Sequence, residues 1–177
     1  MGWKIVVEID KELEKCIFIV IPHTSWVDFF VGLFTRGIIG VELNWLGKKE
    51  LFGFPLGWYF RYMGGAPLDR KGGLNMVESI AQVFENRKIF RLGLSPEGTR
   101  KKVTELKTGF YYIAKQAKVP IVMVGLDYKR KTTIISEPFY TTENIEKDLQ
   151  YIIQFFSTIQ GKHPELGLLH LRTGNSQ

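Results

Sequence analysis

The sequence predicts a single α/β domain in which helices flank a largely parallel mixed sheet. Short runs rich in strand-forming residues alternate along the chain with longer segments whose apolar residues recur every three or four positions. No repeat, low-complexity tract or linker interrupts this alternation. Because 177 residues are an ordinary length for one domain, we expect one unit over residues 1–177, with its core at about 16–160 and a loose C-terminal tail.

The first half of the chain alternates strand and helix from residue 16 onward. Residues 16–21 are continuously apolar and predict a buried strand, which contains the single cysteine, Cys16. A helix is expected over 26–35, beginning at Ser25 and ending near Gly37, because serine caps helix N-termini and glycine follows helix C-termini. A strand at 42–46, a short aromatic helix at 54–62 and a strand at 65–68 follow.

The second half contains the clearer helix periods. Residues 74–84 and 144–159 each carry apolar side chains on one helical face, so both are expected to pack on the sheet. A strand at 89–94 and a helix at 108–117 lie between them, and strands are expected at 120–126 and 132–135. Ligands of such sheets bind where loops leave the carboxyl ends of strands, so functional residues are expected after those ends.

Composition narrows the classes of function. The 24 Lys and Arg residues exceed the 18 Asp and Glu residues, and aromatic residues make up 14% of the chain. This mixture suits an anionic membrane surface, phosphorylated substrates or nucleic acid. No apolar run approaches the ~18 residues that span a bilayer, and the first residues do not read as a signal peptide, so we expect peripheral membrane contact. One cysteine cannot form an internal disulfide, which fits a reducing compartment.

The segment 22–28 joins the buried strand to the first helix and holds the first candidate site. Within one helix, residues five apart lie ~140° apart around the axis. With His23 in the loop and Asp28 in the first helical turn, the chain can fold back so that carboxylate meets imidazole. The carboxylate then fixes the ring tautomer, and the other ring nitrogen can accept a proton from an alcohol. Ser25 and Asp28 equally fit an N-terminal capping pair, in which Asp28 has no catalytic role.

Two further blocks follow later strands. In residues 64–71, Gly65 permits a close backbone approach and Arg70 can bind phosphate oxygens, although a solvated basic loop is the plain alternative. Residues 95–100 read Ser-Pro-Glu-Gly-Thr-Arg. There Glu97 can orient a hydroxyl or hold an arginine, Gly98 can expose backbone amides and Arg100 can bind an anion. The plain alternative for this block is a tight turn with a surface ion pair.

In this order, the three blocks resemble the glycerophospholipid acyltransferase family, which includes the lysophosphatidate acyltransferases. His23 and Asp28 match its His-x4-Asp block, Gly65 and Arg70 match its basic block, and residues 96–100 match its Pro-Glu-Gly-Thr-Arg block without a gap. Pro120, within an apolar strand, matches a fourth block, so the resemblance covers roughly residues 16–126. The sequence departs from the common pattern at Pro22, where an Asn often precedes the His, and at the less apolar stretch 66–68. Within residues 1–177, no segment resembles the N-terminal hydrophobic helices that many members carry.

The resemblance implies a glycerol-3-phosphate acyltransferase-like fold and a fatty acyl transfer. The donor would be an acyl-thioester, acyl-CoA or acyl-ACP (acyl carrier protein), and the acceptor a lysophospholipid hydroxyl, foremost that of 1-acylglycerol-3-phosphate, in phospholipid biosynthesis. His23 would be the general base and Asp28 its support. Substrate would be bound by Gly65, Arg70, Glu97, Gly98, Thr99 and Arg100. The enzyme would be cytoplasmic and peripheral on the inner face of the membrane, with no metal, no cofactor and no nucleic-acid partner.

Several alternatives stay open at this point. The acceptor can be another lysolipid or an amino-lipid. The chain can also be a lipid-binding protein that catalyses no reaction. A nucleic-acid binder is a third alternative, which the scattered basic residues favour least. Ser25 is either the helix cap or a nucleophile. The aromatic segment 52–62 either dips into a membrane interface or places Trp58 and Phe60 in the core.

Overall fold

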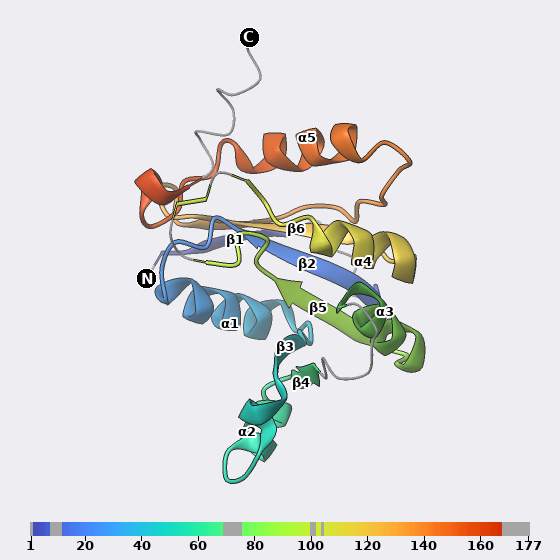
Figure 1. Cartoon of the computed structure of the whole chain (residues 1–177). Helices are drawn as coiled ribbons and strands as arrows, with labels where there is room; N and C mark the ends of the chain where they lie inside the picture. The colour runs from blue at the N-terminus through green and yellow to red at the C-terminus, as the bar shows by residue number, and fades with distance from the viewer. Residues whose placement is uncertain (1, 8–11, 69–75, 100–101, 104, 168–177) are drawn as a thin grey trace.

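A five-stranded mixed sheet forms the centre of the computed structural model, which describes residues 2–7, 12–68, 76–99, 102–103 and 105–167 (Figure 1). Across the sheet, its strands are β1 (Lys4–Val7), β7 (Thr132–Ile135), β6 (Ile121–Asp127), β2 (Lys15–Ile21) and β5 (Phe90–Leu94). β2 pairs in parallel with β5 and β6, whereas β7 is antiparallel to β6 and parallel to β1. The prediction of a largely parallel mixed sheet is therefore confirmed.

The central strands are buried because both faces of the sheet are covered. Ile19 of β2 lies opposite Met123 of β6, and successive side chains of β2 point to opposite faces. Cys16 and Phe18 share one face, on which they pack with Val122 and Val124 of β6. Burial raises the pKa of the Cys16 thiol to about 12, and the nearby charge of Arg91 offsets only part of that rise. Cys16 is thus a core residue, as predicted.

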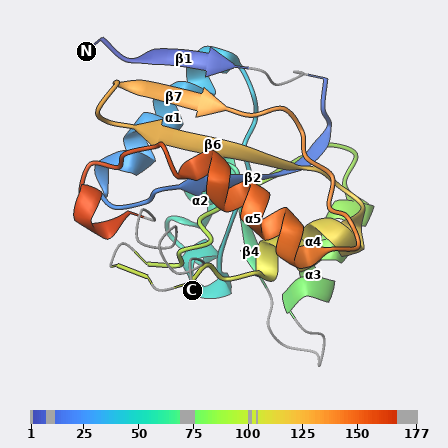
Figure 2. The same cartoon turned by 90° about the horizontal axis from the view of Figure 1, so that it is seen from above.

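Helices form a layer on each side of the sheet (Figure 1), so in the view from above α5 lies in front of the strands and α1 behind them (Figure 2). α1 (Val27–Ile39) covers the face that carries Cys16, and Val31 and Ile39 pack against it. α3 (Met76–Asn86), α4 (Gly109–Ala117) and α5 (Ile145–Phe156) cover the other face through residues such as Phe84, Phe110 and Phe156. Each of these helices buries one apolar stripe, which is the arrangement that their periodicity predicts.

A small second sheet projects from the α1 side of the molecule (Figure 1). It consists of β3 (Trp45–Lys48) and β4 (Gly65–Leu68), paired in parallel. The short helices η1 (Lys49–Phe52) and α2 (Gly57–Tyr62) connect these two strands. The ring of Trp45 contacts those of Phe52 and Phe60. A side chain at Gly65 would meet the Trp45 and Phe52 rings at 2.8 Å, so this position requires glycine for packing.

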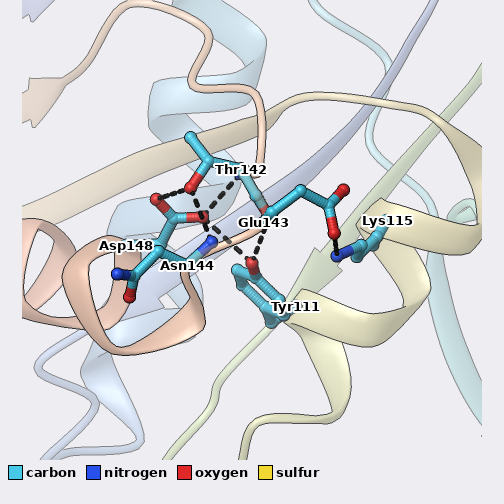
Figure 3. Close-up of polar contacts among 6 residues, drawn as sticks. All are labelled: Tyr111, Lys115, Thr142, Glu143, Asn144 and Asp148. Carbon is cyan, nitrogen blue, oxygen red and sulfur yellow. Dashed lines mark hydrogen bonds and ion pairs between the residues drawn. The ribbon is translucent and has the colours of Figure 1, made fainter.

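A buried carboxylate, Asp148, fixes the start of α5 to α4 (Figure 3). It accepts hydrogen bonds from the hydroxyl of Tyr111 at 3.0 Å and from the amide and hydroxyl of Thr142 at 2.6 and 2.9 Å. Asn144 caps the helix by accepting from the amide of Lys147 at 3.0 Å. These contacts satisfy the carboxylate internally, which is the usual condition for burying such a group.

The structure corrects several element boundaries. α1 continues through Gly37 and ends at Gly40, whose left-handed φ of 69° suits glycine. The strand expected at 42–46 lies at 45–48. The helix expected at 54–62 is shortened to α2 at 57–62, and the short helix η1 at 49–52, which was not predicted, comes before it. β1 was not predicted, because four apolar-rich residues are too short to show a period. Most of the C-terminal tail, residues 168–177, lies outside the described residues, and Pro164–Leu166 before it form the short helix η2.

None of the helices in the described part of the chain combines the length and the apolar character needed to cross a bilayer.

Candidate active site

The His–Asp pair predicted from the sequence is formed. His23 lies in the loop after β2 and Asp28 in the first turn of α1, and His23 Nδ1 lies 3.3 Å from Asp28 Oδ2. The Asp28 side chain is 1% exposed, whereas that of His23 is 28% exposed. The carboxylate is therefore enclosed by protein while the imidazole reaches the surface of a cavity, as a base that meets substrate requires.

The capping interpretation of Ser25 and Asp28 is confirmed in part: both side chains bond amides at the start of α1, but the N-cap residue is Trp26, one position later than predicted. The amide of Ser25 donates to Asp28 Oδ2 at 2.8 Å, and the Ser25 hydroxyl accepts from the amide of Val27 at 3.2 Å. One carboxylate thus serves both the helix start and the imidazole. Burial acts to raise the pKa of Asp28, but hydrogen bonds from His23, Tyr128 and the Ser25 amide outweigh it and lower the pKa below its ordinary value.

Glu97 is brought directly to the pair by the loop after β5. Its Oε2 accepts a hydrogen bond of 2.6 Å from the backbone amide of His23, and the residue is only 3% exposed. Burial raises the pKa of Glu97, and the neighbouring Asp28 adds to that rise while His23 opposes it. Glu97 therefore holds the loop that carries the imidazole, a contact that the sequence did not suggest.

Gly98 adopts the left-handed φ of 63° and closes a tight turn. Its amide donates to the carbonyl of Ser95 at 3.1 Å, so this amide is used within the turn, and the exposure of neighbouring backbone amides stays a prediction. The side chain of Lys107 lies across this glycine, with Nζ 2.6 Å from the place that a Cβ would occupy. Lys107 thus puts an ammonium group beside the loop of Glu97. Thr99, which follows Gly98 in this loop, is exposed.

The remaining predicted binding residues fall in two places. Arg70 and Arg100 lie outside the described residues. Gly65 begins β4 in the small second sheet, where packing against Trp45 and Phe52 accounts for the absence of a side chain.

An apolar cavity of about 650 Å³ opens beside the imidazole. Its walls come from the ends of β2 and β5, from α1 and from the segment containing β3 and α2, so the two sheets enclose it together. Gly32 of α1 and Arg36 line it and also border a smaller void of about 60 Å³ between α1 and the main sheet. Its apolar lining includes Val20, Phe29, Phe30, Leu33, Leu43, Trp45, Phe60, Met63 and Leu94.

Besides Lys107, the sequence interpretation missed a second residue of the site. Tyr128, directly after β6, donates its hydroxyl hydrogen bond to Asp28 Oδ1 at 2.6 Å. Its only sequence signal is its position after the carboxyl end of a buried strand, where ligand sites of parallel sheets lie. Nothing in the spacing of the motifs points to it, because it lies 100 positions from its partner.

Comparison with known proteins gives three matches. The family model described as Acyltransferase matches residues 4–127. The 1-acyl-sn-glycerol-3-phosphate acyltransferase of Saccharomyces cerevisiae is 29% identical over 173 aligned residues, which cover 84% of this chain and 55% of the yeast protein. The chain therefore spans about half the length of this curated relative. The crystal structure of the 1-acyl-sn-glycerophosphate (LPA) acyltransferase PlsC from Thermotoga maritima superposes with a TM-score of 0.58 at 22% identity, covering 99% of this chain and 75% of that one. This last likeness shows that the two proteins share a fold.

Proposed function

Because this chain belongs to the acyltransferase family, we propose that it transfers a fatty acyl group from an acyl-thioester to the free hydroxyl of 1-acylglycerol-3-phosphate. The observation that carries the proposal is a partly exposed imidazole, paired with a buried carboxylate, at the edge of an apolar cavity. The matched yeast protein is a 1-acyl-sn-glycerol-3-phosphate acyltransferase, which supports this acceptor. Acyl-CoA and acyl carrier protein are both suitable donors, because each presents the same thioester.

The reaction follows from the position of the pair. Asp28 holds the Nδ1–H of His23, so Nε2 accepts the hydroxyl proton of the acceptor as that oxygen attacks the thioester carbonyl. The tetrahedral intermediate collapses, the C–S bond breaks, and the imidazolium returns its proton to the thiolate. No acyl-enzyme is needed, because the thioester is already activated. Ser25 is 6% exposed and its hydroxyl is used at the helix start, which supports the cap and not the nucleophile.

The acceptor's phosphate needs cations near this loop. We assign Arg70 and Arg100 to it by their place in the motifs, with Lys107 as a third group because its ammonium lies at Gly98. A planar guanidinium can bind two phosphate oxygens at once, and an ammonium adds a point charge. Glu97 then contributes by holding the His23 loop, with any contact to the glycerol oxygens made by its second carboxylate oxygen.

The acyl chain occupies the apolar cavity in this proposal, and Gly32 tests that placement. A Cβ at Gly32 would meet nothing within 4 Å, and this residue borders the cavity. Gly32→Leu should therefore fill the space and shift donor preference to acyl chains shorter by several carbons, measured as kcat/KM over a chain-length series. Gly37→Leu is the matched control, since Gly37 lies in the same helix with the same open space and does not line the cavity. An equal shift in both variants would contradict the placement.

We further propose that the aromatic face around this cavity contacts the membrane, at its inner, cytoplasmic side. α1 and α2 leave apolar side chains exposed on both sides of the cavity, and Arg36 and Arg61 lie among them. Trp58 is 70% exposed, so the core alternative is wrong for this residue, whereas Phe52 is buried and Phe60 half-buried. The exposed apolar residues are Trp26, Phe29, Phe30, Phe34, Ile38, Phe54, Leu56, Trp58, Tyr59 and Tyr62.

Trp58→Ala should weaken binding to vesicles of phosphatidylcholine and phosphatidylglycerol several-fold, because an interfacial indole contributes apolar area and a polar N–H at the headgroup level. Cosedimentation with such vesicles measures the effect. Tyr140→Ala is the control, since Tyr140 is also well exposed but lies in the loop that leads into α5, and α5 covers the face of the sheet opposite to α1 (Figure 1). Unchanged vesicle affinity in a folded Trp58→Ala protein would refute the membrane face.

An acceptor panel with one labelled acyl-thioester tests the proposed reaction itself. Thiol release should depend on added 1-acylglycerol-3-phosphate, and mass spectrometry should find the label in its diacyl product. Transfer to another lysolipid or to an amino-lipid would change the acceptor and keep the chemistry. Lipid binding without thiol release, across several donors and acceptors, would overturn the assignment as an acyltransferase.

A further inference from the structure

We infer that Tyr128 is a positioning residue for the His23–Asp28 pair: its phenol fixes the carboxylate in one orientation and takes up part of its negative charge. The inference rests on the proposed function for its kinetic consequences. It concerns a residue outside all of the matched motif blocks, on a different element from the pair.

The hydrogen bonds divide the two oxygens of Asp28 between different partners. Oδ2 accepts from the Ser25 amide and faces His23 Nδ1, whereas Oδ1 accepts from the Tyr128 hydroxyl at 2.6 Å. Ser25, just before α1, and Asp28, in its first turn, are joined by two hydrogen bonds across the helix start. Tyr128 is anchored to β6, so its bond ties that turn to the end of the main sheet. The carboxylate therefore cannot rotate away from the imidazole without losing a short hydrogen bond.

Tyr128 is itself held from two directions. Its ring meets the Trp3 ring edge-on, with centroids 5.1 Å apart and an interplanar angle of 89°. Its amide donates to the carbonyl of Gln160 at 2.8 Å. Burial, and after it the bond to Asp28, raises the pKa of Tyr128, so the phenol remains a neutral donor. A neutral donor shares the charge of a carboxylate without supplying a counter-charge.

Removing the hydroxyl should make the pair more basic. In Tyr128→Phe, Asp28 Oδ1 loses its donor and its negative charge is less dispersed, so the carboxylate stabilises the imidazolium of His23 more strongly. Asp28 also loses one of the hydrogen bonds that lower its own pKa. Both effects have the same sign. The pair keeps its proton to higher pH, so the acid limb of the pH–rate profile shifts to higher pH.

Other titratable groups around the pair stay the same in this variant. Glu97 faces it from the loop after β5, and Lys107 lies on the neighbouring Gly98. Arg36 of α1 and Tyr59 of α2 face it across the cavity. His163, whose amide donates to Thr24, pairs its ring with Glu165. Because none of these is altered, a change in titration belongs to the lost phenol.

The test is the titration of the His23 imidazole by nitrogen–proton NMR of the whole chain, which needs no substrate. The chain has three histidines, so the spectrum of His23→Gln assigns the signal. In Tyr128→Phe the titration midpoint should rise by roughly half a pH unit or more. The acid limb of the kcat/KM profile should shift to higher pH by the same amount. At neutral pH, kcat should fall about two- to fivefold and recover as pH rises, whereas KM should not change.

Tyr140→Phe is the control and should leave both profiles unchanged, since Tyr140 is exposed, lies in the loop before α5 and does not line the cavity beside the pair. A folded Tyr128→Phe protein with lower thermal stability but an unchanged His23 titration would overturn the inference and leave Tyr128 a merely structural residue. If Tyr128→Phe does not fold, Trp3→Leu replaces it, because this variant keeps the phenol and removes the ring that packs against it. The inference then requires a smaller rise in the titration midpoint of His23. If the wild type shows no acyl transfer, the proposed function fails, while the NMR titration still decides the role of Tyr128.

Discussion

Replacing His23 with alanine is expected to slow acyl transfer by ~10²–10⁴-fold, the usual cost of losing a general base. The acceptor hydroxyl would then have to lose its proton to water while it attacks the thioester. The fold should tolerate the change, because the bond that ties this loop to Glu97 comes from the backbone amide of residue 23 and not from its ring. Loss of rate should therefore appear in kcat, with donor binding nearly intact.

Single-turnover thiol release at saturating acceptor measures this loss without interference from product release. His163→Ala is the matched control, because that ring pairs with Glu165 at the surface and its connection to Thr24 is again through the backbone amide. A near-normal rate in His23→Ala would exclude the imidazole as the base. An equal loss in both variants would indicate a general effect on the fold.

Replacing Asp28 with asparagine is the second large effect, with an expected loss of about 10²–10⁴-fold in kcat through the wrong imidazole tautomer. Three donors point at this carboxylate, from His23, Tyr128 and the Ser25 amide. An asparagine offers one acceptor oxygen, so at least one donor would face its NH2 group. If that donor is His23, the ring flips to the tautomer whose Nε2 carries a proton and cannot act as a base.

The same substitution should also lower stability in a pH-dependent way. A buried donor left without its acceptor costs about 1–3 kcal/mol. Because the fold lowers the pKa of Asp28 below 3.8, its ionised form stabilises the wild type above that value, and this stabilisation is lost as pH falls through the folded pKa. The difference in unfolding free energy between wild type and Asp28→Asn should therefore shrink on acidification, as measured by denaturant titration.

Asp148→Asn separates the loss of catalytic rate from the loss of stability. Asp148 is a buried carboxylate with three hydrogen bonds at the junction of α4 and α5 (Figure 3), and the partners of these bonds are Tyr111 and Thr142, not His23. We expect a comparable loss of stability with kcat close to that of the wild type. If Asp28→Asn lost stability but kept its rate, the carboxylate would be a helix cap alone, which is the alternative that the sequence left open.

The sequence predicted the sheet class and the meeting of His23 with Asp28, and both are confirmed. It could do so because strand and helix periods depend on neighbours a few positions apart, and because the pair lies within one turn of a loop and helix start. It misplaced the segment from 42 to 62, where frequent glycines and aromatic residues give no clear period.

What the sequence determined by itself is therefore the order of the elements and the family to which the motifs belong, since both are written in short-range patterns. Only the tertiary structure decided that Tyr128 meets Asp28, that Glu97 holds the amide of His23, and that α1 and the small second sheet enclose an apolar cavity beside the imidazole. These contacts join segments brought together by the packing of helices on the sheet. Burial is a property of the assembled fold, and no spacing along the chain specifies which distant side chain will fill a given place.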